Sequence, residues 1–220
     1  MKLSRGLTAA LIFVAVIVLD QALKIWVKTH FYLHESVEIA SWFKLLFVEN
    51  NGMAFGMELG SKLFLTVFRI VVVGVLIWWI ARLSLRKRAR RGAIACLSLI
   101  AAGAFGNIID CVFYGVIFNN PPAPEVAVMF PPEGGYAPLF FGKVVDMLYF
   151  PLFSFDWPQW VPVVGGEHFV FFQPVFNLAD AAITCGLLAM LIFYSGKGHF
   201  MGSDSDRATA TAVPTEGVRE

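Results

Sequence analysis

The 220-residue chain is 58% hydrophobic and only 15% charged, whereas a soluble domain averages about 45–50% apolar and about 25% charged residues. This composition excludes a disordered chain, a disulfide-stabilised miniprotein and an ordinary cytosolic enzyme. A net charge of +1 also excludes the overall basic field that attracts nucleic acid. We therefore predict a polytopic membrane protein.

Four apolar windows have about the 20-residue length that a membrane-spanning helix needs. They cover Leu7–Val27, Leu63–Ile80, Ala93–Phe113 and Val175–Tyr194. The first window carries Asp20 and Lys24 and lacks a small-residue cleavage site, so we do not expect it to be a cleavable signal peptide. The predicted fold is an all-α membrane protein, built as a bundle of four transmembrane helices.

The segment that joins the second and third windows is strongly basic. Its positive residues are Arg82, Arg86, Lys87, Arg88, Arg90 and Arg91. Because short loops rich in Lys and Arg stay in the cytoplasm, we predict that both termini are cytoplasmic. Residues 1–196 would then form one integral-membrane domain. Residues 197–220 would form a polar cytoplasmic tail, whose small residues predict disorder.

Two long segments are then expected on the outer side of the membrane. Residues 29–62 contain the stretch SVEIASWFKLLFVE, whose alternating apolar residues predict a small sheet at the membrane surface. Residues 114–174 hold ten of the 11 prolines of the chain, and proline lacks the backbone donor that a helix needs. We predict that this second segment is a long extended loop, whose many aromatic residues suit contact with the bilayer.

Neither metal nor disulfide chemistry is indicated. Cys96, Cys111 and Cys185 lie in apolar stretches without metal-ligand spacing, so we predict that all three are small buried hydrophobic residues. His30 and His34 lie beside Glu35, but no third metal ligand is evident and surface positions are expected. We expect no metal and no organic cofactor.

Polar side chains inside the apolar windows are the most informative feature, since such groups are costly in lipid and usually mark function. They are Asp20, Lys24, Arg69, Asn107, Asp110, Asn177 and Asp180. With a rise of about 1.5 Å per residue, the carboxylates of three windows are expected in one outer layer of the membrane. Helical spacing places Gly103, Asn107 and Asp110 on one face of the third window.

Three functions are compatible with such a layer. The polar side chains could hold the helices together in a non-catalytic membrane assembly protein. They could line an ion pathway in a small polytopic transporter, for which acids spread through the membrane and an inverted repeat would be expected. A pair of carboxyl groups could instead activate water for hydrolysis, because two close carboxyl groups share one proton.

Five segments of the chain resemble, in order, the motifs of bacterial lipoprotein signal peptidases, the aspartyl proteases also called signal peptidase II. The segments are DQALK (20–24), NNGMAFG (50–56), GAFGNIID (103–110), GKVVDM (142–147) and FNLADAAI (176–183). The resemblance implies that Asp146 and Asp180 form the catalytic dyad. One would act as general base toward water and the other would donate a hydrogen bond to the scissile carbonyl. Which residue is the base stays open.

The resemblance also implies supporting or substrate-binding roles at the remaining motif positions. These are Asp20, Lys24, Asn50, Gly52, Ala54, Gly103, Asn107, Asp110 and Asn177. The implied substrate is a diacylated prolipoprotein, cleaved before its diacylglyceryl-cysteine near the periplasmic face of the bacterial inner membrane. The implied enzyme is a monomer that contacts membrane lipid and binds no nucleic acid.

The chain departs from the family pattern in two places. Cys111 stands where the family commonly has arginine, so Lys24 or Arg69 would have to substitute as the partner of Asp110. The segment between Asp110 and Asp146 is also longer than in compact members of the family, which affects how the active site is covered.

Overall fold

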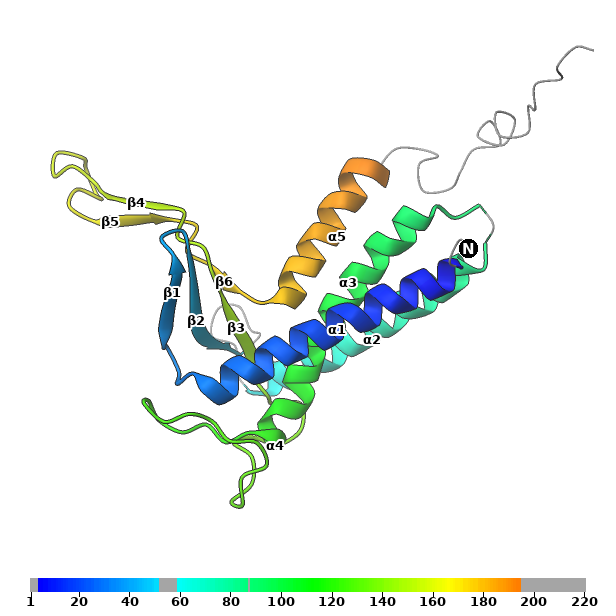
Figure 1. The fold of residues 1–220 in the computed structure, drawn as a ribbon, viewed down its shortest axis with the longest axis horizontal. Helices are drawn as coiled ribbons and strands as arrows, with labels where there is room; N and C mark the ends of the chain where they lie inside the picture. The colour runs from blue at the N-terminus through cyan, green and yellow to red at the C-terminus, as the bar shows by residue number, and fades with distance from the viewer. Residues whose placement is uncertain (1–3, 52–58, 87, 195–220) are drawn as a thin grey trace, which may run out of the picture.

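Three long helices form the main body of the protein (Figure 1), whose computed structural model describes residues 4–51, 59–86 and 88–194. They are α1 (Arg5–His30), α2 (Leu59–Ser84) and α3 (Arg91–Ile109). Within the described residues, these three are long and apolar enough to cross a membrane, whereas α5 (Leu178–Tyr194) is a shorter apolar helix of 17 residues.

The third and fourth predicted windows compare differently with the structure. The third window is confirmed, since α3 continues through a π-helical turn, η1 (Asp110–Tyr114), into α4 (Gly115–Ile117), and together they form one apolar helical span over Arg91–Ile117. The fourth window is wrong at its start, because Val175–Phe176 form strand β6 and α5 begins only at Leu178. A β-strand and a buried helix can share one apolar pattern, so hydrophobicity did not locate this boundary.

Strands from between α1 and α2 and from between α4 and α5 form a four-stranded antiparallel sheet with the order β1-β2-β3-β6. The strands are β1 (Ser36–Ala40), β2 (Phe43–Asn50), β3 (Val144–Tyr149) and β6. The sheet predicted within residues 29–62 is confirmed as the hairpin β1–β2. The fold is not all-α, however, because residues 114–174 add β3 to this sheet and form a separate hairpin, β4 (Phe153–Asp156) with β5 (His168–Phe171).

The surface of the helices is apolar where lipid would contact it. Large hydrophobic side chains are exposed on α1, α2 and α5, among them Leu19, Phe64 and Ile192, which are 61%, 72% and 70% exposed. Helix α5 packs through small residues, and Ala179, Ala182 and Gly186 are buried. Cys185 lies outside this packed face and is exposed, so the prediction of a buried residue there is wrong, whereas Cys96 and Cys111 are buried.

Helices α3 and α5 pack closely at Gly103. A Cβ atom added there would lie 2.2 Å from the carbonyl oxygen of Ala179 and 2.8 Å from the side chain of Ile183. The backbone oxygen cannot rotate away as a flexible side chain could. Glycine is therefore required at this position, and the packing of α3 on α5 depends on it.

Replacing Gly103 by alanine is expected to push α5 away from α3, which would lower the thermal unfolding temperature. Gly74→Ala on α2 is the matched control, because a Cβ atom at Gly74 would meet no atom within 4 Å. Thermal unfolding in detergent measures both variants. An unchanged unfolding temperature for Gly103→Ala would contradict this account of the helix contact.

Candidate active site

Asp180 is held by the N-terminal cap of α5. The side-chain oxygen of Asn177 accepts a hydrogen bond from the backbone N–H of Asp180 (2.9 Å), and the Asp180 carboxylate accepts one from the backbone N–H of Asn177 (3.3 Å). This reciprocal pair is a capping box, which the spacing Asn-x-x-Asp makes possible. The first turn of α5 thus fixes the carboxyl group of Asp180.

Asp146 comes from β3 and reaches the same place. The side-chain amide of Asn177 donates to Asp146 Oδ1 (2.7 Å) and to Asn107 Oδ1 (3.1 Å), and the amide of Asn107 donates to Asp180 Oδ1 (2.8 Å). Two linked amides therefore connect the two carboxyl groups. Asn50, at the end of β2, also hydrogen-bonds to Asp146.

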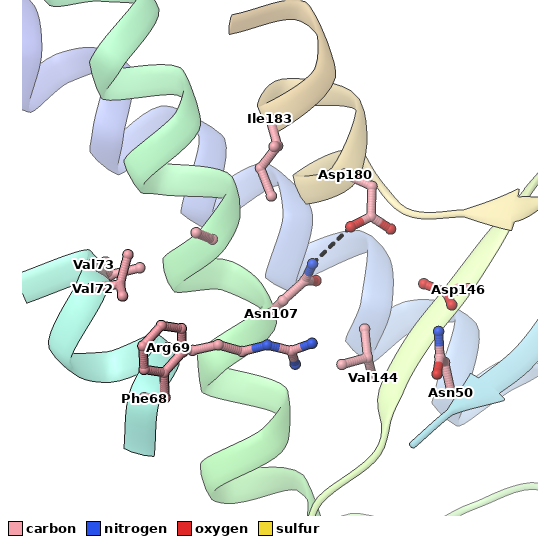
Figure 2. Close-up of a pocket in the computed structure, with 11 residues that line it drawn as sticks. Asn50, Phe68, Arg69, Val72, Val73, Asn107, Val144, Asp146, Asp180 and Ile183 are labelled. Atoms are coloured by element: carbon pink, nitrogen blue, oxygen red, sulfur yellow. Dashed lines mark hydrogen bonds between the residues drawn. The ribbon is translucent and has the colours of Figure 1, made fainter. Parts of the chain in front are cut away.

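Both carboxyl groups line one cavity of about 340 Å³ between the sheet and the helices (Figure 2). Its other walls are apolar side chains from α2, α3, α5 and β3, namely Phe68, Val72, Val73, Ala104, Val144 and Ile183. The guanidinium of Arg69 also points into this space (Figure 2), with Nη1 4.0 Å from Cys111 Sγ. The cavity thus has a polar end with the two acids, and the rest of its wall is apolar apart from the Arg69 guanidinium.

The environment of Asp146 favours its protonated form. Burial raises the pKa of Asp146 to about 7, and the negative charge of Asp180 contributes to this rise, whereas hydrogen bonds from Asn177 and Asn50 and the charge of Lys24 oppose it. The side chain is nearly buried, with 4% exposure. Near neutral pH, a proton can therefore stay on the pair of acids, as general acid–base catalysis by two carboxyl groups requires.

Behind the cavity lies a buried group of charges centred on Lys24. Its ammonium contacts Asp20 at 2.9 Å, Asp110 at 2.8 Å and the side-chain oxygen of Asn107 at 2.8 Å. The two carboxylates and the ammonium are fully buried. Asn107 hydrogen-bonds to both Lys24 and Asp180. The charge cluster therefore fixes the orientation of the Asn107 amide, which in turn holds the Asp180 carboxyl group.

The two carboxylates of this cluster also position the neighbouring elements. Asp20 Oδ1 accepts a hydrogen bond from the backbone N–H of Ala179 in the first turn of α5 (2.9 Å), where a negative charge is favourable. Asp110 Oδ2 accepts one from the backbone N–H of Val145, next to Asp146 (3.3 Å). One acid therefore anchors α5 and the other anchors β3. Lys24, not Arg69, pairs with Asp110.

Gln21 belongs to this cluster, although the sequence analysis did not single it out. Its amide nitrogen donates to Asp110 Oδ1 (2.9 Å) and to Asp20 Oδ2 (3.2 Å), and its oxygen accepts from the hydroxyl of Tyr114 (3.1 Å). A signal was available, because Gln21 is an amide inside an apolar window. Amide side chains in lipid also require hydrogen-bond partners, which they find across helices.

A second buried ion cluster lies beside the first, under the sheet. Glu49 on β2 pairs with Lys28 at the end of α1 and with Lys143 (2.9 Å). Burial would raise the pKa of Glu49, but the two ammonium groups outweigh burial and hold this pKa below its ordinary value. Because Glu49 precedes Asn50 and Lys143 lies three residues before Asp146, this cluster ties together the two strands that face the cavity. Sequence reasoning missed it, since each residue alone looks like a surface charge.

Most of the predicted site residues are thus brought together. Asp146, Asp180, Asn50 and Asn107 line the cavity, Asn177 links the two acids, and Asp20, Lys24 and Asp110 form the buried cluster. Gly103 supports the cavity from outside, through the contact of α3 with α5. Gly52 and Ala54 lie outside the described residues.

Comparison with known proteins agrees with this arrangement. A family model described as "Signal peptidase (SPase) II" matches residues 12–195. A lipoprotein signal peptidase of Porphyromonas gingivalis is 51% identical over 193 residues, which cover 88% of this chain and 85% of that protein. A lipoprotein signal peptidase of Amoebophilus asiaticus is 37% identical, with coverage of 80% and 72%.

A solved bacterial membrane enzyme shares the fold, with a TM-score of 0.56 and 24% identity over 84% of this chain and 90% of that one. Fold, motif positions and sequence similarity over most of the chain agree: the protein belongs to the signal peptidase II family of membrane peptidases.

Proposed function

We propose that the protein is a membrane aspartyl endopeptidase that removes the signal peptide from lipid-modified prolipoproteins by cleaving before the diacylglyceryl-cysteine. Family membership supports the peptidase activity and the prolipoprotein substrate class. The observation that carries the chemistry is the placement of Asp146 and Asp180 on one cavity, connected through the amides of Asn107 and Asn177.

Hydrolysis by such a pair begins with one shared proton. The ionised carboxyl group removes a proton from water, whose oxygen bonds to the scissile carbonyl carbon, while the protonated group donates a hydrogen bond to the carbonyl oxygen. Collapse of the tetrahedral intermediate then breaks the C–N bond, and a carboxyl group protonates the departing nitrogen. Each turnover uses one water and returns the pair to its initial charge. A coupled pair titrates as a unit, so neither residue is assigned as the base.

In the proposed topology, α5 is the fourth spanning helix and both termini are cytoplasmic. The support is the basic loop between α2 and α3, which would lie on the cytoplasmic side. The sheet at the opposite end of the helices would then face the periplasm (Figure 1). Asp180 lies in the first turn of α5, so the site would lie just below the outer surface of the inner membrane.

The shape of the cavity suits the proposed substrate. Its apolar walls come from the helices, and its polar end lies where β3 approaches α5. A peptide bond could bind at the acids while the hydrocarbon next to it stays between the helices. Arg69 adds hydrogen-bond donors to this space, which suits the carbonyl oxygens of a peptide or an ester.

A purely structural role explains only part of the polar layer. Asp20, Lys24 and Asp110 are fully buried and join α1 to α3, as a membrane assembly protein would also require. Asp146 and Asp180 line a cavity instead. Carboxyl groups that line a cavity can reach a bound molecule, so their placement supports a catalytic role more than a role in helix packing.

The direct test is cleavage of a diacylated precursor peptide by the purified full-length chain in lipid nanodiscs, followed by mass spectrometry. We expect two products, separated at the bond before the lipid-modified cysteine. The same peptide without its diacylglyceryl group serves as the control and is expected to be cut far more slowly. Failure to cut the lipidated peptide, or cleavage at another bond, would contradict the proposal.

The rate of cleavage is expected to fall above neutral pH. The raised pKa of Asp146 means that the folded protein keeps this proton up to about pH 7, well above the pH at which an ordinary aspartic acid loses it. As the pH rises through that value, the pair loses its shared proton and can no longer protonate the leaving nitrogen. A profile of kcat against pH should therefore show an alkaline decline with an apparent pKa near 7. A rate that keeps increasing to pH 9 would contradict a shared proton.

A further inference from the structure

The hairpin β4–β5 is separate from the main sheet and extends away from the helices (Figure 1). It leaves the main sheet after β3 and returns into β6, immediately before α5. In its antiparallel register, Phe153 lies opposite Phe171 and Phe155 lies opposite Phe169. Residues that are directly opposite, and residues two apart on a strand, point to the same face.

The hairpin therefore has two different faces. One is aromatic: the Phe153 and Phe171 rings are stacked with centroids 4.8 Å apart, the Phe155 and Phe169 rings are 5.1 Å apart, and Trp157 extends this face, 5.0 Å from Phe155.

The opposite face is more polar. It carries Ser154 opposite Val170 and the pair Asp156–His168, whose side chains are 2.6 Å apart and mostly exposed. Only one of the two faces is therefore suited to water.

The aromatic face and the adjoining loop are open to the surroundings. Phe153 and Phe171 are 53% and 43% exposed, and in the loop Trp160 and Val163 are 82% and 98% exposed. Residues 157–166 contain no charged side chain. An isolated two-stranded hairpin is at best marginally stable in water, and exposed apolar patches of this kind mark contact sites. We therefore expect this surface to be covered by lipid or by another protein.

A series of contacts between aromatic rings runs from the base of the hairpin toward the main sheet and α5. Phe172, at the base of the hairpin, is 6.0 Å from Phe176, which is 5.6 Å from Phe150, which in turn is 4.8 Å from Phe43. Phe176 lies two residues before α5, whose outward side chains are apolar and exposed. The base of the hairpin is thus linked by ring contacts to the start of a helix whose outward side chains are apolar. Aromatic side chains collect near the ends of spanning helices in membrane proteins.

We propose that the aromatic face and the loop of the β4–β5 hairpin insert into the outer headgroup region of the lipid bilayer. The hairpin connects β3, which carries Asp146, to α5, which carries Asp180. Its contact with lipid would therefore set the depth of both carboxyl groups beneath the membrane surface. The effect on the depth of the carboxyl groups rests on the proposed function, whereas the contact of the hairpin with lipid does not.

The test places an environment-sensitive fluorophore at single cysteines in the full-length chain. Cys185, which is exposed, is first replaced by serine, while Cys96 and Cys111 are buried and protected from labelling. The probe is attached at Phe171→Cys on the aromatic face or at Val163→Cys in the loop. Ser154→Cys on the more polar face is the matched control. Each protein is reconstituted in nanodiscs of phosphatidylcholine with and without spin-labelled phosphatidylcholine.

We expect blue-shifted emission and several-fold stronger quenching by the spin-labelled lipid at positions 171 and 163 than at position 154. Water-like emission at all three positions would overturn the proposal. So would a blue shift without lipid quenching that grows with protein density, because it would identify a second copy of the chain as the cover.

A second measurement does not depend on cysteine variants. The difference between the fluorescence of the wild type and that of Trp160→Phe isolates the emission of Trp160, which brominated phosphatidylcholine should quench. Its accessibility to aqueous iodide alone would also overturn the proposal. Both readouts are independent of peptide cleavage, so a failed cleavage assay and a failed lipid contact are distinguishable.

Discussion

Replacement of either Asp146 or Asp180 by asparagine is expected to reduce kcat for the diacylated precursor by at least about 10³-fold, within the range that general acid–base groups contribute. Asparagine keeps the size of the side chain but can neither remove a proton from water nor hold the shared proton. Both positions should be equally sensitive, since the two carboxyl groups act as one unit. Single-turnover cleavage in nanodiscs measures the loss.

The control for this experiment is Glu38→Gln on β1. Glu38 is an exposed carboxylate, paired with Lys44 at the surface, so its replacement should leave kcat unchanged. The asparagine variants should also keep the wild-type unfolding temperature or exceed it, because Asp146 is buried near another acid. Retained turnover in either variant would remove that residue from the chemistry.

Replacing Lys24 by methionine is expected to have the largest effect on stability. Methionine has similar length, but the change leaves Asp20 and Asp110 facing each other in a fully buried place without their cation. Removal of one partner from a buried ion cluster typically costs about 3 to 5 kcal/mol. The thermal unfolding temperature in detergent should fall strongly, and activity should fall with it because Asn107 loses the hydrogen bond from the Lys24 ammonium.

Lys44→Met provides the comparison. Lys44 also forms an ion pair, but it lies at the surface with Glu38, where water replaces the lost contact. Its unfolding temperature should match that of the wild type. If Lys24→Met also unfolded at the wild-type temperature, the buried cluster would not be what joins α1, α3 and the start of α5.

Local sequence patterns were sufficient for much of the site. The apolar windows predicted α1, α2 and α3, because the length and hydrophobicity of a helix are properties of the segment itself. Charged or amide side chains inside the four apolar windows drew attention to Asp20, Lys24, Asn107, Asp110 and Asp180. Their depth along each helix follows from a constant rise per residue, and so their convergence in one layer could be predicted before any contact was known.

Contacts between distant segments were decided only by the tertiary structure. The choice of Lys24 over Arg69 as the partner of Asp110 depends on how α1, α2 and α3 pack. The pairing of β3 with β2 and β6 joins segments that lie far apart in the chain, and proline content said nothing about that register. The two-residue strand β6 could not be predicted either, since its apolar residues could equally begin a helix.

By itself, the sequence determined which segments are apolar, where charge interrupts them and which residues match the family motifs, because each is a property of a short stretch of chain. Only the tertiary structure decided that a strand delivers Asp146 to the capped end of α5, that Gln21 and Lys28 are buried among charges, and that an aromatic hairpin extends away from the helices. These features depend on contacts between segments that are distant in the sequence. Such contacts stabilise the protein only after folding has brought the segments together and removed water from between them.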